Sequence, residues 1–350
     1  MRAAPNVRIE RWTRASATRT AILALAIAAL FVVPAFSGTD VTQKLTGLWI
    51  LVLMATMWNA LAGYGGLVSV GQQAFIGIGA YATIYLTHAG VEGYLAMAIA
   101  VLITAVLAFG VSFIVLRLRG GEFAIAMWVL AEVFRQFVAF DKAVGGGTGI
   151  SLTALSVYGS DGQRALSYLW TLGAAVLGLV ILFVLLRSRS GAALQAIRDD
   201  ETAASSLGVR VLANKRLIFV LTSAGCAAAG AGILANTLFV QPNTIFSVQW
   251  TAMMIFMVLV GGLGTFEGPV LGALILFVLQ VQFGDGGVWY FVGLGAAAIL
   301  FALFLPRGIW GTFSDRFHIP LAPIGYWVRG NLATTRAADG AADPAEEVST

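Results

Sequence analysis

A glutamate and an arginine stand three residues apart in the apolar stretch "VLAEVFRQFV", where few other side chains could do chemistry. This spacing puts Glu132 and Arg135 at neighbouring positions on one helix face. Ionisable residues within a membrane are costly and generally face protein or water. Two interpretations follow: an internal ion pair that allows both residues to be buried, or the lining of a polar passage and its outer mouth. Because Arg135 would hold Glu132 ionised, proton cycling at this carboxylate is disfavoured.

A second polar stretch among apolar ones is "GYGGLVSVGQQAFIGIGAY", residues 63–81. The adjacent amides of Gln72 and Gln73 are about 100° apart on a helix, so we expect one to bridge helices and the other to face a cavity. Glycines permit close helix packing and also local unwinding, which a membrane tolerates only where protein or a water-filled cavity surrounds the backbone. The stretch therefore predicts a solute passage or its tightly packed wall. The candidate pathway residues are Ser69, Gln72, Gln73, Glu132 and Arg135.

The chain lacks the common catalytic and nucleotide-binding motifs. Its two histidines, His88 and His318, form no H-E-x-x-H, no serine stands in G-x-S-x-G, and no lysine follows a glycine. A Walker A phosphate loop is therefore excluded. The single cysteine, Cys226, excludes an internal disulfide. We expect no catalytic residue, no metal and no cofactor, and hence no enzyme.

The amino-acid composition indicates that this chain folds in a membrane rather than in water. Of its 350 residues, 59% are hydrophobic and 11% are charged, whereas soluble domains carry roughly a quarter charged residues. Apolar stretches long enough for a helix of about 20 residues across a bilayer recur along the chain. The sequence predicts an all-α, polytopic transmembrane helical bundle with about ten spans and a re-entrant or broken glycine-rich segment. The expected spans are 20–36, 45–62, 67–87, 94–116, 122–140, 166–186, 217–240, 248–263, 268–283 and 288–305. The alternative for the pair around "VLVGGLGTFEGPVLGALIL" is one broken helix plus a re-entrant piece.

Basic residues test this layout. When the spans cross alternately, most of the 21 basic residues fall on one side, and the other side receives Lys44, Lys142 and Arg164. Positive residues collect in the cytoplasm, so we expect both termini there. The formal net charge of +4 is then explained by basic residues on the cytoplasmic side of the membrane rather than by nucleic-acid binding. The cytoplasmic side holds the amino terminus, the segments near 63–66, 117–121, 187–216 and 264–267, and the tail.

Three regions are expected along the chain. Residues 1–19 form a basic cytoplasmic segment, and residues 20–311 form a transmembrane domain with a cytoplasmic loop at 187–216. Residues 312–350 form a cytoplasmic tail that is disordered at its small, polar, acidic end. The first span follows a long basic leader, and the layout needs it as a crossing rather than as a cleaved signal peptide.

The 187–216 loop is longer than an ordinary connection between two spans. Its stretch "SGAALQAIRDDETAASSLGVRV" consists of good helix formers and is stopped by Gly208. Leu194, Ile197, Ala204 and Leu207 share a face at helical spacing, while the charged residues fall elsewhere. We expect a short amphipathic helix that docks in a groove of another protein. The alternative is a helix lying on the bilayer surface, against which four successive charges argue.

Four stretches together resemble the branched-chain amino acid permeases of ATP-binding cassette importers, and the LivM branch more than the LivH branch. "GLVSVGQQAFIGIGAYAT" is similar to the family's early signature, and "LAEVFRQFVAFDKAVGGGTGI" to its mid-chain helix and glycine loop. "AIRDDETAASSLGVRVLANKRLIFVLTSAGCAAAGAGILA" resembles the long cytoplasmic loop and the helix after it. "MVLVGGLGTFEGPVLGALIL" and "LFLPRGIWG" resemble the closing motifs. The resemblance covers about residues 45 to 311.

The resemblance implies a permease subunit of the bacterial inner membrane, surrounded by lipid. Its partners would be a second, LivH-like permease, two cytoplasmic ATP-binding subunits and a periplasmic solute-binding protein. ATP binding would move the docked 190–208 helix and switch the passage between outward and inward access. Thr202 stands where relatives often carry an acid, with Glu201 one position early. The implied ATPase-coupling residues are Leu194, Ile197, Arg198, Asp199, Asp200, Glu201, Ala203, Ala204 and Gly208, and the implied helix-packing residues are Gly261, Gly262, Gly264, Gly268 and Gly272.

Other functions stay open at this point. A secondary transporter driven by protons or sodium would use Glu132 as its titrating or ion-binding group. A purely structural membrane subunit would not need the amide-rich stretch. Within the resembling family, the solutes include branched-chain amino acids, urea and amides, and the binding protein does much of the selecting.

Overall fold

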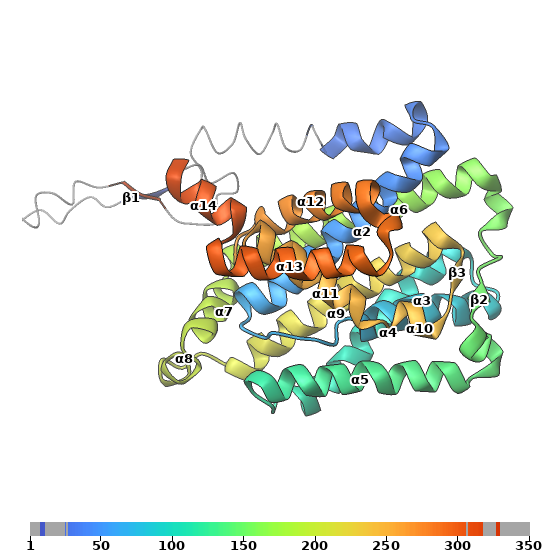
Figure 1. The fold of residues 1–350 in the computed structure, drawn as a ribbon. Helices are drawn as coiled ribbons and strands as arrows, with labels where there is room; N and C mark the ends of the chain where they lie inside the picture. Colours follow the sequence, from blue (N-terminus) through green and yellow to red (C-terminus); the bar gives the residue numbers. More distant parts are fainter. Residues whose placement is uncertain (1–7, 11–24, 26, 306, 318–326, 330–350) are drawn as a thin grey trace, which may run out of the picture.

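The computed structural model describes residues 8–10, 25, 27–305, 307–317 and 327–329, and helices make up most of it (Figure 1). The basic segment expected at 1–19 and most of the tail expected at 312–350 lie outside the described residues. The longer helices are α2 (Thr39–Asn59), α3 (Gln73–His88), α4 (Gly93–Val115), α5 (Gly120–Phe140), α6 (Gly159–Arg187), α9 (Val211–Thr237), α11 (Val248–Gly261), α12 (Gly268–Phe283) and α13 (Val288–Phe304). The shorter ones are α7 (Arg189–Asp199), α8 (Glu201–Ser206), α10 (Pro242–Ile245), α14 (Gly308–Phe317), the π-helical turn η1 (Ala60–Tyr64), and 3₁₀ turns at Lys142–Val144, Gly146–Thr148, Ser156–Tyr158 and Gly284–Gly286.

Seven of the described helical segments are long and apolar enough to cross a membrane. The chain is therefore a polytopic helical protein, as predicted. Three of the expected spans are shorter helices, namely Ile27–Phe36, α3 and α12. The 16 residues of α3 or of α12 extend about 24 Å, less than the roughly 30 Å of a hydrocarbon core. The seven segments are Thr39–Tyr64, Gly93–Val115, Gly120–Phe140, Ser156–Arg187, Val211–Thr237, Pro242–Gly261 and Val288–Ser314.

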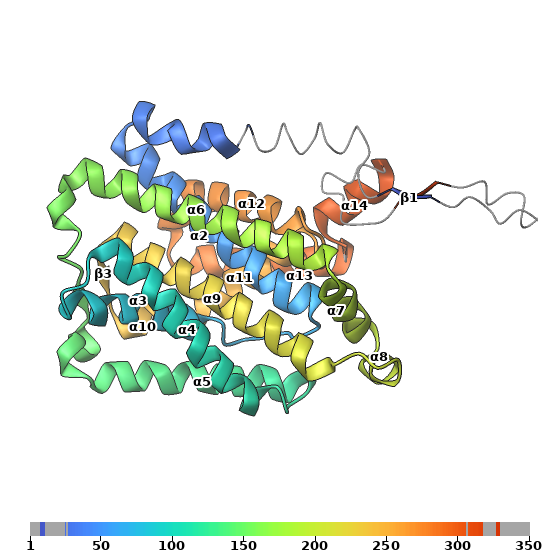
Figure 2. The same cartoon turned by 180° about the vertical axis from the view of Figure 1, so that it is seen from behind.

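Helix α9 lies at the centre of the bundle, against α2, α3, α4 and α6 (Figures 1 and 2). Its second half contains "SAGCAAAGAGILA", and such small residues let helix backbones approach closely. A Cβ at Gly230 would overlap the carbonyl oxygen of Ile76 on α3, and a Cβ at Gly79 on α3 would overlap that of Ala227. The core therefore forms where α9 meets α2 and α3.

Helices α4, α5 and α13 present apolar side chains outward. Val106 of α4, Phe137 of α5 and Leu303 of α13 are 73%, 70% and 71% exposed. Soluble monomers rarely expose contiguous apolar surface of this kind. It is the surface expected of helices that face lipid or another membrane subunit.

The connections between helices gather at two ends of the bundle, which we name the α7 end and the β3 end (Figures 1 and 2). At the β3 end, β2 (Ile150–Ser151) pairs antiparallel with β3 (Phe239–Val240), so that Ile150 faces Val240. A second antiparallel pair joins β1 (Arg8–Glu10) to β4 (Trp327–Arg329). Within the part of the chain that the structure describes, these two pairs account for all the β-strands.

Candidate partner-docking and passage sites

The 187–216 loop folds as two helices, α7 and α8, rather than as the single helix expected from its sequence. Asp200 between them has φ −155° and ψ 109°, and its carboxylate accepts hydrogen bonds from the backbone N–H groups of Thr202 and Ala203 at 2.8 and 2.9 Å. Aspartate is a favoured N-cap, so it ends one helix and starts the next. Gly208 follows α8 with φ +82°, the conformation expected just past a helix.

The apolar face of α7 and α8 packs against the chain's own helices, which corrects the expectation that this face docks in another protein. Leu194, Ile197 and Ala204 have exposed fractions of 0%, 4% and 2%, whereas Leu207 is 84% exposed. The break at Asp200 interrupts the helical spacing, so the four apolar residues do not form one stripe. The surface left for a partner includes Arg198, Asp199, Asp200, Ala203 and Gly208.

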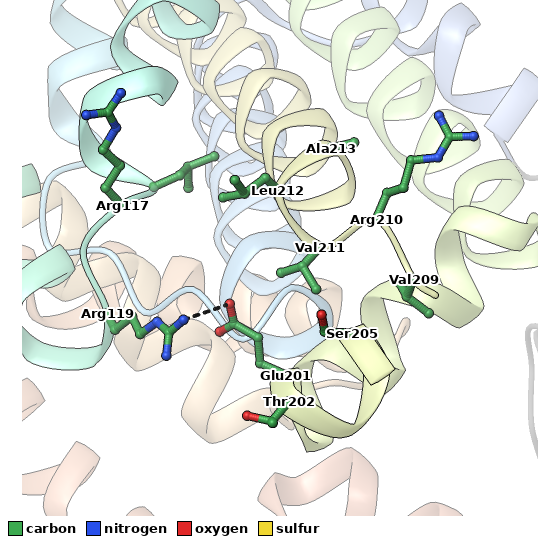
Figure 3. A pocket seen from close by; sticks show the side chains of 11 residues that line it. Arg117, Arg119, Glu201, Thr202, Ser205, Val209, Arg210, Val211, Leu212 and Ala213 are labelled. Atoms are coloured by element: carbon green, nitrogen blue, oxygen red, sulfur yellow. Dashed lines mark ion pairs between the residues drawn. The ribbon is translucent and has the colours of Figure 1, made fainter. Parts of the chain in front are cut away.

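A groove of about 720 Å³ lies between α8, the start of α9 and the connection from α4 to α5 (Figure 3). The Glu201 carboxylate in this groove lies 2.7 Å from Nζ of Lys215 and 4.0 Å from the guanidinium of Arg119. Lys215 is buried, so its ammonium depends on Glu201 for compensation. Arg119 points toward Glu201, while Arg117 and Arg210 point away from it (Figure 3). Glu201 therefore links α8 to α9 and to the connection between α4 and α5.

Arg198, at the end of α7, connects the loop to α2. Its Nη1 donates a hydrogen bond to the carbonyl oxygen of Gly63 at 2.9 Å, and its other nitrogens donate to Asp199 at 2.8 and 3.0 Å. Gly63 belongs to η1, the π-helical turn that continues α2, and its backbone lies directly against that of Gly264. This hydrogen bond therefore joins α7 to the turn that continues α2.

Asn59, which the sequence analysis missed, joins α2 to the turn between α11 and α12. It is fully buried, donates from Nδ2 to the carbonyl of Thr265 at 2.8 Å, and accepts at Oδ1 from the N–H of Gly264 at 2.8 Å. Both ends of the amide are thus satisfied, as a buried polar group requires. An asparagine inside the apolar run "ATMWNALAG" was the signal that could have identified it.

The five glycines between 261 and 272 meet two different needs. Gly262 and Gly264 have φ +134° and +74°, which favour glycine, and they form the turn that Asn59 holds. A Cβ at Gly261 would overlap the carbonyl oxygen of Gly268, and a Cβ at Gly272 would overlap that of Met257. Helices α11 and α12 therefore meet backbone to backbone beside the turn. A Cβ at Gly268 would likewise press on Thr265 and Gly262.

The segment 65–72 leaves the helix between η1 and α3, although most of it is buried. Gly66 lies against Arg198 at the α7 end. Gly71 lies against the carbonyl of Met127, which is well inside α5. Non-helical backbone thus enters the bundle where protein surrounds it, the condition under which a membrane tolerates such backbone.

The polar side chains of this segment are buried but differ in their partners. The Oγ of Ser69 accepts a hydrogen bond from the N–H of Gly71 at 3.2 Å. Gln73 accepts a hydrogen bond from the hydroxyl of Thr251 on α11 and so bridges two helices. Neither amide atom of Gln72 has a hydrogen-bond partner within the described part of the chain. Two adjacent glutamines therefore have opposite environments.

Glu132 and Arg135 form an ion pair on the outside of α5, with Nε of Arg135 2.8 Å from the carboxylate. The two side chains are 52% and 23% exposed, so the chain itself does not bury them. Arg135 also donates to the side chain of Asn243 in α10 at 2.6 Å, and Glu132 accepts from Gln136 at 3.3 Å. Among the described residues, neither side chain of the pair is hydrogen-bonded to Ser69, Gln72 or Gln73.

Residues 40–304 match the family model described as "Branched-chain amino acid transport system / permease component". The chain belongs to this permease family. It is 28% identical over 331 residues to the high-affinity branched-chain amino acid transport system permease protein LivM of Salmonella typhimurium, and 29% identical over 331 residues to LivM of Escherichia coli. Each alignment covers 80% of this permease and 77% of its relative. A probable LivM permease of Methanocaldococcus jannaschii is 26% identical over 190 residues, 52% of this permease and 55% of the relative. This permease is therefore a multi-pass membrane transport protein.

Proposed function

We propose that the permease is a membrane subunit of an ATP-driven ABC importer that carries branched-chain amino acids, or a related small polar solute, across the bacterial inner membrane. It works with a second, LivH-like permease, two cytoplasmic ATP-binding subunits and a periplasmic solute-binding protein. The names of the LivM relatives support this solute, and the family description, a permease component of a transport system, supports an assembly. ATP hydrolysis takes place in the partners, and this chain supplies the passage.

The hydrogen bond from Arg198 to Gly63 is the observation that carries the proposal. It joins α7, which has an exposed charged surface, to the end of a core helix. Asn59 extends the connection to the turn between α11 and α12. ATP-binding subunits that dock on α7 and α8 would therefore displace η1 and this turn together. Small shifts at such packed contacts convert between discrete arrangements of helices.

The passage is proposed to run beside α5 and the segment 65–72, with Ser69, Gln72, Gln73, Glu132 and Arg135 along it. An ion pair left exposed on a membrane-spanning helix is costly against lipid. Helix α5 therefore faces the second permease, which covers the pair. The buried amide of Gln72, behind α5, gains partners when the helices shift.

We place the α7 end in the cytoplasm, together with both chain termini. The basic residues at this end, such as Arg119, Arg198 and Lys215, favour that side. Ten crossings result if the three shorter apolar helices also cross.

Purification of the tagged permease in mild detergent, with mass spectrometry of its partners, tests the proposal. We expect two ATP-binding subunits and a second permease. Ala203→Trp puts a bulky side chain on the exposed surface of α8 and should remove the ATP-binding subunits while the second permease stays bound. Ser160→Trp, at the exposed start of α6, is the matched control and should retain every partner.

One outcome would overturn this assignment. If the permease is recovered alone and still moves solute in vesicles that contain no ATPase, an ion-coupled transporter that uses Glu132 becomes the better explanation.

A further inference from the structure

A polar cleft of about 430 Å³ lies at the β3 end, away from the α7 groove. The first turns of α2, the last turn of α9 and the last turns of α12 form it. Clefts of roughly 300–1,000 Å³ commonly hold small-molecule ligands. The lining side chains that matter below are Asp40, Gln43, Lys44, Asn236, Phe277 and Gln280.

The position of the cleft follows from the directions of its three helices. Helix α2 ends at η1, beside Arg198, and α12 begins just after the turn that contains Gly264. Helix α9 begins near Lys215, which pairs with Glu201 of α8. The opposite ends of all three helices form the cleft, so it lies one helix length from the α7 end. It faces the side on which a periplasmic binding protein would dock.

Two opposite charges share this cleft without pairing. Asp40 and Lys44 stand four residues apart in α2, and hence on one helix face. Neither side chain makes a hydrogen bond or an ion pair with any residue that the structure describes. Gln43 and Asn236 add amide donors and acceptors, and Phe277 adds an aromatic wall. A carboxylate, an ammonium, amides and an apolar wall are therefore available together to one ligand.

We propose that this cleft binds the zwitterionic head group of an amino acid. Asp40 accepts hydrogen bonds from the ligand's ammonium, Lys44 donates to its carboxylate, and its aliphatic side chain lies against Phe277. The inference rests on the proposed function, because it takes an amino acid as the transported solute. The cleft receives this solute after its release from the binding protein and before it enters the passage.

The charge balance of the cleft favours a zwitterion over an anion or a cation. A ligand with one charge would satisfy either Asp40 or Lys44 and leave the other unpaired. Hydrogen bonds between ionised groups are roughly twice as strong as neutral ones. Both charges of the ligand should therefore contribute, each through a different side chain.

Saturation-transfer NMR on the complete importer, in lipid nanodiscs without its binding protein, tests this site with leucine, leucinamide and N-acetylleucine. Wild type should bind leucine at least about tenfold more tightly than either analogue. Lys44→Gln should weaken leucine about tenfold and leave leucinamide, which lacks the carboxylate, unchanged. Asp40→Asn should weaken leucine similarly and leave N-acetylleucine, which lacks the ammonium, unchanged. Asp161→Asn and Arg164→Gln, which alter charges at the start of α6, are controls and should bind like wild type.

ATP-driven leucine uptake with the binding protein, measured on the same preparations, separates the two claims. Uptake by wild type without selective leucine binding to the importer would overturn the cleft and keep the proposed function. Selective binding without ATP-driven uptake would support the cleft and contradict the proposed function. If either cleft variant weakens all three ligands equally, the residue has only a structural role, and the assignment is wrong.

Discussion

Among the described residues, the α7 end of the bundle is held by charged side chains that reach into protein, whereas the β3 end is held by hydrogen bonds of neutral side chains and of exposed carboxylates, and by a short strand pair. Lys215 is buried beside Glu201, and Arg198 donates to a backbone carbonyl of the helix pair α2–η1. At the β3 end, Tyr158 donates to the exposed carboxylate of Glu92 at 2.7 Å. Removing the partner of a buried charge costs far more than removing that of an exposed one. The two ends should therefore respond differently to substitution.

This difference suits the two tasks in the proposed function. An end that transmits the movement of a docked ATPase needs contacts that stay formed during the movement. At the α7 end, Arg198 joins α7 to η1, and Glu201 joins α8 to Lys215 of α9. An end that receives solute needs polar groups that are not already paired. The β3 end provides these in Asp40 and Lys44.

The largest effect is expected from Arg198→Ala. This substitution removes the charge-assisted hydrogen bond to Gly63, so ATP-driven uptake should fall at least about tenfold even though the ATPases still bind. Uptake into vesicles is measured at equal amounts of assembled importer. The matched control is Arg189→Ala, at the exposed start of the same helix, which should transport like wild type. Equal uptake by the two variants would show that α7 does not act through Gly63.

Glu201→Gln should have the next largest effect, on stability. The substitution leaves the buried ammonium of Lys215 without a carboxylate. The free energy of unfolding should fall by about 1–3 kcal/mol, less than for a fully buried pair because the Glu201 side chain is 32% exposed. Thermal denaturation of the purified permease measures the change.

A second variant on the same loop provides the comparison for Glu201→Gln. Asp199, whose side chain is 68% exposed, pairs with Arg198 at the surface. Asp199→Asn should cost less than about 1 kcal/mol. If Asp199→Asn melts at the lower temperature of the two, burial of Lys215 is not what holds the α7 end together.

Apolar runs predicted the long helices, because length and hydropathy act within a single segment. The break at Asp200 was not predicted, since a carboxylate that caps the next helix competes with the helix propensity of the whole stretch. The burial of Leu194 and Ile197 was not predicted either. An amphipathic pattern identifies the apolar face of a helix but not whether it meets its own chain or a partner.

Side-chain partners could be predicted only over short distances in the sequence. The pairing of Glu132 with Arg135 follows from helical spacing. The contact of Asn59 with Gly264 joins residues 205 positions apart, and it depends on how α2 packs against the turn. The same limit applies to Gln72 and Gln73, because the neighbour that satisfies Gln73 comes from a distant helix.

Gln72 and Gln73 lie between the two ends, and we expect substitutions there to change stability by less than Glu201→Gln does. Gln72→Leu removes a buried amide that has no partner among the described residues, so stability should rise by about 1–2 kcal/mol. ATP-driven uptake should nevertheless fall, because we place this amide along the passage. Gln73→Leu leaves the hydroxyl of Thr251 unpaired and should lower stability by about 1–2 kcal/mol. Unchanged uptake by Gln72→Leu would remove Gln72 from the passage.

The smallest effect is expected at Glu92, just before α4. Burial raises the pKa of its carboxyl, but hydrogen bonds from Tyr158 and from the N–H groups of Tyr94 and Leu95 lower it more, so the pKa lies below its ordinary value of 4.5. The ionised carboxyl therefore stabilises the fold above pH 4.5, and this contribution is lost as the pH falls through the folded-state pKa.

Glu92→Gln should consequently be less stable than wild type by under about 1 kcal/mol at neutral pH, because the carboxylate is exposed. The difference should vanish in acid, once the wild-type carboxyl is protonated. Melting temperatures of both proteins, recorded from neutral pH to well below 4.5, follow this convergence. A gap that stays constant with pH would mean that the hydrogen bonds of Glu92 do not depend on its charge. Glu92 would then stabilise the β3 end through hydrogen-bond geometry alone, in contrast to the α7 end, where the buried ammonium of Lys215 requires the carboxylate of Glu201.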